Sequence, residues 1–160
     1  MKQTLLVAAV VFSTMSVAHA GGQPGSVGVG AEFQLSNVGG ISVNYDTGKF
    51  HVGGFLGLAD PAGQENTRID LGGRFFYHVA SSAMSDFSVG GSVGISSNDA
   101  GPNVDRTTSL FIEPAFQIRA FITSNVALSF TGGFSIGAAD SSDLVITGDT
   151  NGQAGVHYYF

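Results

Sequence analysis

The sequence contains no cysteine and no tryptophan, and only 11% of its 160 residues are charged. Without cysteine, the chain has no disulfide scaffold, no thiolate zinc site and no cysteine nucleophile. Soluble globular domains usually have a charged fraction of roughly 25%, more than twice the value found here. The six Lys and Arg residues are outnumbered by 12 Asp and Glu residues, so we expect no nucleic-acid partner.

Glycine and phenylalanine are abundant instead, with 24 and 13 copies. The many Phe and Val residues, together with only four Pro, argue against a disordered chain. The length allows one domain, preceded by a targeting segment. The composition therefore indicates one folded, glycine-rich domain with little charge to present to water.

Residues 1–20 have the pattern of a secretory signal peptide. Lys2 gives a positive start, residues 5–12 form an uncharged apolar run, and Ala18-His19-Ala20 provides a small-x-small cleavage site. The apolar run is shorter than the ~20 residues that a membrane-spanning helix needs. We therefore predict a cleaved signal peptide at 1–20 and a mature domain at 21–160.

Apolar and small or polar residues alternate through the mature chain with a period of two, which is typical of β-strands. The alternating stretches are 27–35, 41–45, 50–58, 68–79, 87–96, 110–122, 126–137 and 153–160. Turn residues separate them, with short links alternating with longer polar links. Pro114 is the awkward residue, because a proline removes a ladder donor and usually marks an edge or a bulge. The pattern predicts an all-β fold of eight antiparallel strands in up-and-down order.

Two barrel architectures fit this pattern. In a soluble barrel the apolar residues line a cavity, whereas in a transmembrane barrel they face lipid and the polar residues face the lumen. The polar faces here consist mainly of Gly, Ser, Ala and Thr, which would make a poor water-facing surface. Strands of about 9–11 residues also suit a tilted crossing of the bilayer. We therefore predict an eight-stranded antiparallel transmembrane β-barrel.

This orientation turns charged residues of the strands into the barrel. The predicted lumenal charge network consists of Glu32, Asp70, Arg74, Glu113 and Arg119. A buried charge is tolerated when it is paired and hydrogen-bonded. We expect Arg74 and Glu113 to contact each other or Glu32. Arg68 either joins the network or lies unpaired at a loop margin.

The last residues of the chain resemble the C-terminal targeting signal of bacterial outer-membrane β-barrel proteins. Gln153, Gly155, Tyr158 and the terminal Phe160 stand in the register of that signal. The resemblance extends over the mature chain to small barrels of the OmpA/OmpX type. It implies that the barrel-assembly machinery recognises the final strand, that both termini lie in the periplasm, and that the longer links face outside.

The resemblance also suggests partners. We expect outer-membrane lipid and lipopolysaccharide around the barrel, a monomeric state and a Gram-negative cell envelope. The outer links carry many more acidic residues than basic ones. They are Asp60, Glu65, Asp99, Asp105, Asp140, Asp143 and Asp149 against Arg106. None of these links has EF-hand spacing, so a solvated acidic rim is the simpler interpretation.

No group of residues in the sequence has the pattern of a catalytic, metal-binding or phosphate-binding site. His51, His78 and His157 fall at the periplasmic ends of the third, fourth and eighth predicted strands, away from outer-leaflet lipid. We take these three strands not to adjoin, which argues against a metal site. The glycine run at 89–94 lacks the Gly-Lys-Ser/Thr ending of a phosphate loop. We predict no catalytic residue, no metal and no cofactor.

The sequence thus predicts an integral outer-membrane barrel with a closed, polar-filled lumen and a structural or surface-interaction role. A narrow, porin-like channel for ions or small solutes is the first alternative. A lipid-modifying enzyme of the outer membrane is the second. A soluble ligand-binding barrel in the periplasm is the third.

Overall fold

A computed structural model of the chain describes residues 23–34, 39–60, 67–99, 101, 105–139 and 149–160. The predicted signal peptide at 1–20 lies outside these residues. The strands are β1 (Val27–Gln34), β2 (Gly39–Asp46), β3 (Phe50–Ala59), β4 (Thr67–Ser81), β5 (Ser85–Asp99), β6 (Thr107–Phe121), β7 (Val126–Ala139) and β8 (Asp149–Tyr159). Within the described ranges, no helix has the length and apolar character needed to cross a membrane.

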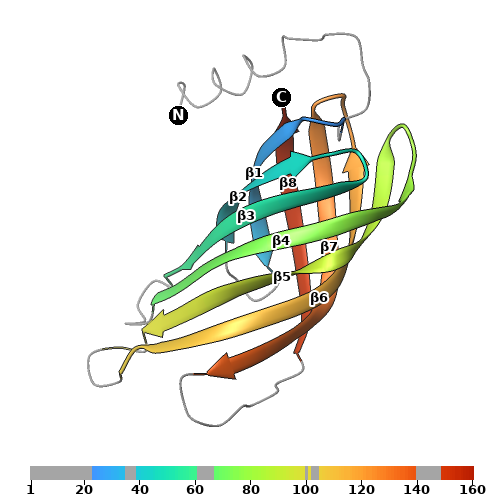
Figure 1. Cartoon of the computed structure of the whole chain (residues 1–160). Coiled ribbons are helices and arrows are strands. Elements are labelled where there is room, and N and C mark those ends of the chain that lie inside the picture. The colour runs from blue at the N-terminus through green and yellow to red at the C-terminus, as the bar shows by residue number, and fades with distance from the viewer. Residues whose placement is uncertain (1–22, 35–38, 61–66, 100, 102–104, 140–148) are drawn as a thin grey trace, which may run out of the picture.

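The eight strands form a closed barrel in which each strand pairs with its neighbours in the chain and β1 pairs with β8. All eight pairings are antiparallel. The backbone N–H of Phe160 donates to the Val27 carbonyl at 2.9 Å, so β1 begins and β8 ends at the same end of the barrel. We call this the terminal end and the opposite one the loop end (Figure 1). The predicted fold class is confirmed.

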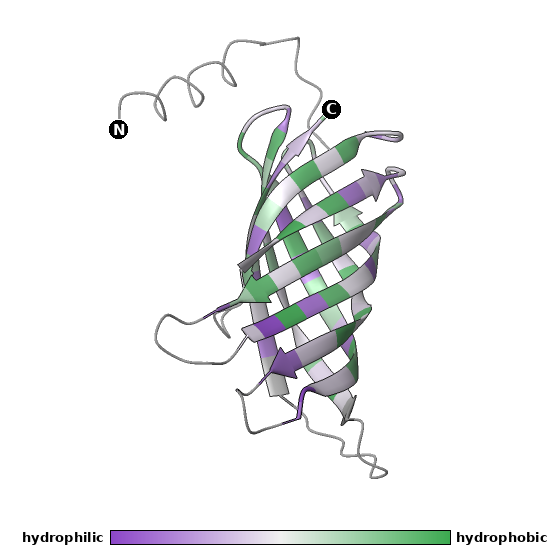
Figure 2. Ribbon diagram, turned by 90° about the vertical axis from the view of Figure 1, so that its left-hand side faces the viewer, coloured by the Kyte–Doolittle hydropathy of each residue, from purple (hydrophilic) through white to green (hydrophobic). Residues whose placement is uncertain are grey.

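Residues alternate between the two faces of the barrel wall, as the period of two predicts. Large apolar side chains are exposed on the outside, among them Ile41, Ile112 and Phe130. Figure 2 shows the alternation of hydrophobic and hydrophilic residues along the strands. The buried polar and charged residues are Ser42, Asn44, Asp46, His51, Asp70, Arg74, Asp86, Ser88, Glu113, Gln117, Arg119, Ser129 and His157. This distribution is the reverse of the one in a water-soluble protein.

Several strands extend beyond the predicted stretches. β4 reaches Ser81 and β5 begins at Ser85, so Asp86 belongs to a strand rather than to a link. β2 likewise includes Asp46 as its last residue. β8 begins at Asp149, four residues before the predicted start, which shortens the preceding link. The segment 144–147 lies outside the described residues.

Pro114 lies inside β6 rather than at an edge of the sheet. The β6–β7 ladder pairs Ile112 with Ile136 and resumes at Ala115 with Gly133, so Glu113 and Pro114 have no ladder partner on β7. A proline has no N–H to donate, which accounts for the interruption. The barrel wall accommodates the proline by a local gap in one ladder.

Candidate functional site: the charged interior of the barrel

The five residues of the predicted charge network all lie on the inner face of the barrel. Asp70, Arg74, Glu113 and Arg119 are buried, and the Glu32 side chain is only 10% exposed. They come from β1, β4 and β6. The structure brings two of the five together and pairs Asp70 with Arg68, whose place the sequence left undecided. It joins Glu113 and Arg119 to residues that we did not predict.

Arg74 and Glu32 are the predicted pair that meets. The two guanidinium nitrogens Nη1 and Nη2 of Arg74 each donate to one Glu32 carboxylate oxygen at 2.5 Å. Two parallel charge-assisted hydrogen bonds fix both orientation and distance. Gly155 on β8 leaves room for this pair, because an added Cβ there would lie 3.1 Å from the Glu32 Cγ atom.

His157 extends this group toward β2. Its Nε2 atom lies 2.6 Å from the Ser42 hydroxyl and 3.4 Å from Glu32 Oε1. Strands β1, β2, β4 and β8 are therefore linked through side chains in the middle of the barrel.

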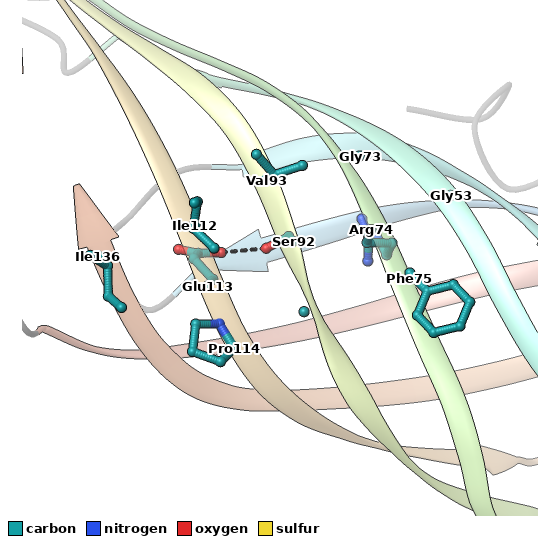
Figure 3. Close-up of a pocket in the computed structure, with 11 residues that line it drawn as sticks. Gly53, Gly73, Arg74, Phe75, Ser92, Val93, Ile112, Glu113, Pro114 and Ile136 are labelled. Carbon is teal, nitrogen blue, oxygen red and sulfur yellow. Dashed lines mark hydrogen bonds between the residues drawn. The ribbon is translucent and has the colours of Figure 1, made fainter. Parts of the chain in front are cut away.

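Glu113 does not take part in this ion pair, which corrects the expected contact with Arg74 or Glu32. Its carboxylate accepts hydrogen bonds from the Ser92 hydroxyl at 2.7 Å and from the Asn151 amide. Figure 3 shows Glu113, Ser92 and Arg74 beside a hollow of about 600 Å³ that also borders Pro114. Within the described ranges, no basic side chain bonds to Glu113. The ladders set Arg74, Ser92 and Glu113 in one row of the wall. Arg74 nevertheless bonds to Glu32 across the lumen, and Glu113 bonds to Ser92, the residue that lies between them.

Asp70 pairs with Arg68, two residues before it on β4. Arg68 Nε donates to Asp70 Oδ1 at 2.9 Å and to the Ser96 hydroxyl at 3.1 Å. Asp70 is buried, whereas the Arg68 side chain is 38% exposed near the loop end. Arg68 therefore joins the interior charges, which the sequence left undecided.

Arg119 has the largest set of partners. Its Nε and Nη2 atoms donate to the Asp86 carboxylate at 3.0 and 2.8 Å, and Nη2 also donates to Asp46 at 2.7 Å. Its Nη1 atom donates to the Tyr159 hydroxyl at 2.9 Å. Arg119 thereby connects β2, β5 and β8 to its own strand at the terminal end of the barrel.

The sequence analysis missed Asp46 and Asp86 as partners of Arg119. Both are buried, and both lie on inner faces that continue to the strand ends. In β2, Asp46 points to the same face as Ser42 and Asn44, because it is an even number of residues from them. In β5, Asp86 points to the same face as Ser88 for the same reason. If the alternating stretches were extended by one residue at these two strand ends, the sequence would predict that both carboxylates face inward.

Two of the three histidines adjoin, which corrects the view that their strands are separate. β3 pairs with β4, and His51 lies opposite Phe76, two residues from His78. The Nδ1 atom of His51 lies 2.9 Å from the Nε2 atom of His78. His157 is apart from them, on β8 beside Glu32.

The residues of the predicted assembly signal lie on β8 and at the chain end. Gly155 is buried and faces inward, whereas Phe160 is 76% exposed. The Tyr158 and Phe160 rings are in edge-to-face contact, with centroids 4.9 Å apart. Gln153 pairs with Gln34 of β1 and Thr131 of β7. The structure thus places the segment at the seam between first and last strands.

Comparison with solved structures identifies the architecture. The N-terminal β-barrel domain of Pseudomonas aeruginosa OprF superposes with a TM-score of 0.62 at 15% sequence identity, covering 86% of this chain and 98% of that one. The chain has the fold of a small outer-membrane β-barrel. Ail, the attachment invasion locus protein of Yersinia pestis, matches with a TM-score of 0.48 at 10% identity, covering 86% of this chain and 100% of Ail. No protein-family model and no curated protein sequence matches the chain.

Charged side chains occupy the interior of this small barrel at three levels. Ion groups lie near the loop end (Arg68–Asp70), in the middle (Arg74–Glu32) and at the terminal end (Arg119 with Asp46 and Asp86). In an environment of low dielectric constant, the buried Arg74–Glu32 and Arg119–Asp46 pairs are held more strongly than they would be in water. The arrangement can brace the wall from inside and obstruct passage along the lumen.

Proposed function

We propose that this chain is an integral outer-membrane barrel protein, closed in its resting state, with a structural or surface-interaction role in the envelope. One observation carries the proposal: Arg119, with 1% of its side chain exposed, bonds to β2, β5 and β8 across the terminal end of the barrel. The apolar outside and the fold shared with the OprF barrel domain support placement in an outer membrane. The terminal end then faces the periplasm, and the loop end faces outside.

Conductance is the direct test of closure. The untagged protein is refolded into detergent and reconstituted into a planar lipid bilayer. We expect no stepwise conductance at moderate voltage, because the Arg74–Glu32 and Arg119–Asp46 pairs join non-adjacent strands across the lumen. Frequent, uniform opening of the unmodified protein would contradict closure.

A narrow channel is the second candidate function, and Glu113 is the observation that favours it. This carboxylate is buried and is bonded to neutral partners, Ser92 and Asn151. The channel would be selective for cations, since the interior ion groups contain more acidic than basic side chains. Glu113→Gln would reduce cation over anion permeability in the channel and would change nothing in a closed barrel.

We propose that the protein has no enzymatic activity and that its partners are outer-membrane lipid and lipopolysaccharide. Overexpression should leave the mass spectrum of lipid A unchanged. A new lipid A species that disappears after one substitution at the loop end would favour the lipid-modifying alternative. Light scattering in detergent should give the mass of a monomer.

Assembly is proposed to depend on the exposed C-terminal phenylalanine. Phe160 extends beyond β8 while its N–H remains bonded to Val27. Deleting Phe160 should reduce the amount of folded barrel in the outer membrane but leave spontaneous refolding in detergent unchanged. Loss of refolding in detergent would instead show that Phe160 acts on stability. Sequencing the N-terminus of the membrane form tests cleavage after Ala20.

A further inference from the structure

A carboxylate and two imidazoles converge at the terminal end of the barrel. One ligand atom from each of Asp46, His51 and His78 lies within 4.8 Å of the others. Asp46 and His51 are paired across the β2–β3 hairpin, and His78 comes from the adjoining β4. Asp46 and His51 are buried, whereas His78 is half-buried. The cluster therefore has a path to solvent on the His78 side.

The hydrogen bonds of His78 determine which of its nitrogens carries the proton. Its Nδ1 atom lies 3.1 Å from the Gly48 carbonyl oxygen, which can only accept, so Nδ1 carries the proton. Its Nε2 atom lies 3.0 Å from Arg119 Nη2, which can only donate. The Nε2 lone pair of a neutral His78 ring therefore points into the cluster.

Donors and acceptors in the cluster are unequally matched. The single lone pair of His78 Nε2 already faces the Arg119 donor, and His51 Nδ1 also lies 2.9 Å from it. A protonated Nδ1 would be a second donor to that lone pair, and an unprotonated Nδ1 would place a second lone pair against it. Meanwhile His51 Nε2 is buried and has no hydrogen-bond partner among the described residues. Buried polar atoms in native proteins are nearly always satisfied, so an orphan nitrogen in a cluster of metal-ligating groups calls for an explanation.

The groups around the cluster orient its side chains in the way that the surroundings of a metal site orient the ligands. Histidine ligands usually donate their other N–H to a carboxylate or a backbone carbonyl, as His78 does to Gly48. The Gly48 N–H also donates to Asp46 Oδ1 at 2.8 Å. Gly48 has φ of 84°, a backbone conformation that favours glycine. One turn residue thus orients two of the three candidate ligands.

Arg119 is the group that competes with a cation here. Its charge has a partner of its own, because Asp86 accepts from Nε and Nη2 and Tyr159 accepts from Nη1. Arg119 can therefore release Asp46 and His78 while keeping Asp86 and Tyr159. One free carboxylate and two neutral imidazoles then remain for the cation.

We propose that Asp46, His51 and His78 form a binding site for a first-row divalent metal ion such as Zn²⁺, with water completing the coordination. Imidazole nitrogens with a carboxylate suit zinc, nickel and copper, whereas calcium and magnesium prefer sets of oxygen ligands. The ion joins β2, β3 and β4 at the terminal end. The site shares Asp46 with the Arg119 group and is separate from the Arg74–Glu32 and Arg68–Asp70 pairs.

Cobalt serves as the spectroscopic probe. The untagged chain is refolded into detergent micelles, washed with a chelator and titrated with Co²⁺, and Zn²⁺ is then added. We expect visible ligand-field bands that saturate at one ion per chain and are lost on displacement by Zn²⁺. His51→Ala and His78→Ala should each weaken binding by about tenfold or more. His157→Ala, which removes a buried histidine outside the cluster, is the matched control and should bind like the unmodified chain.

Folding of each variant is checked by the mobility of unheated samples on a denaturing gel. Because His78 is half-buried, His78→Ala remains informative even where His51→Ala fails to fold. Zn²⁺ should also raise the unfolding temperature of the unmodified chain and of His157→Ala, but not that of His78→Ala. Absence of saturable binding, or equal loss in His157→Ala and His78→Ala, would overturn the proposal.

Discussion

Arg74 on β4 and Glu32 on β1 form a two-pronged ion pair across the inside of the barrel, with both contacts at 2.5 Å. Neither strand is a neighbour of the other, since β4 pairs with β3 and β5. The pair therefore fixes a distance across the lumen rather than along the wall. It reinforces the closed shape that the ladder between β1 and β8 completes.

Removing one member of this pair should destabilise the barrel strongly. Arg74→Gln leaves the Glu32 carboxylate in the interior without its cation, which costs about 3–5 kcal/mol for a buried pair. Urea unfolding in lipid vesicles measures the change in the free energy of unfolding. Arg106→Gln, which breaks the exposed pair with Asp99, is the control and should cost under about 1 kcal/mol. Equal effects of the two substitutions would show that the interior pair is as well solvated as the surface one.

Arg119 should not be replaceable by lysine. Its Nε, Nη1 and Nη2 atoms donate to partners on four other strands, β2, β4, β5 and β8. A lysine ammonium at the end of one flexible side chain cannot reproduce that fork of donors. We expect Arg119→Lys to lose about 2 kcal/mol or more of unfolding free energy although the charge is kept. The measurement is the same urea titration. A lysine variant as stable as the unmodified chain would mean that charge alone matters at this position.

The outer face should tolerate charge at its margin but not at its centre. Ile112 lies near the middle of β6 and is exposed, so Ile112→Arg should cost about 2–4 kcal/mol in a bilayer. Val79 is exposed near the terminal end of β4, and Val79→Arg should cost about 0–1 kcal/mol. Unfolding titrations in vesicles compare the two. If both substitutions proved neutral and the chain folded in plain buffer, the outer face would be a water-facing surface.

Two adjacent glycines on opposite faces make a matched pair. At Gly53, on the inner face, an added Cβ would lie 2.6 Å from the Val43 carbonyl oxygen, whereas at Gly54 the nearest atom would be 3.6 Å away. Gly53→Ala should therefore destabilise the barrel by about 1–3 kcal/mol through overpacking. Gly54→Ala should be neutral or stabilise by about 0.5–1 kcal/mol, because alanine restricts the unfolded chain. Urea unfolding in vesicles compares the two variants, and the opposite order would mean that the inner face has more room than the structure shows.

The alternation of side chains along the sequence determined the strands, the two faces and the barrel class by itself. A period of two is a local property, since each residue points to the side opposite its predecessor. Polar faces made mostly of small residues then decided which side faces inward. The same rule, continued to the strand ends, would also have turned Asp46 and Asp86 inward.

Only the closed tertiary structure decided which interior groups meet. Arg119 reaches Asp46 from 73 positions away, and Arg74 reaches Glu32 from 42 positions away. Such contacts depend on the register of every intervening ladder, because a shift of one residue would turn a whole strand over. To predict that His51 and His78 lie side by side, only the pairing of β3 with β4 would have been needed. Alternation along the chain thus fixed the direction of each side chain, whereas register and closure of the barrel fixed its partner.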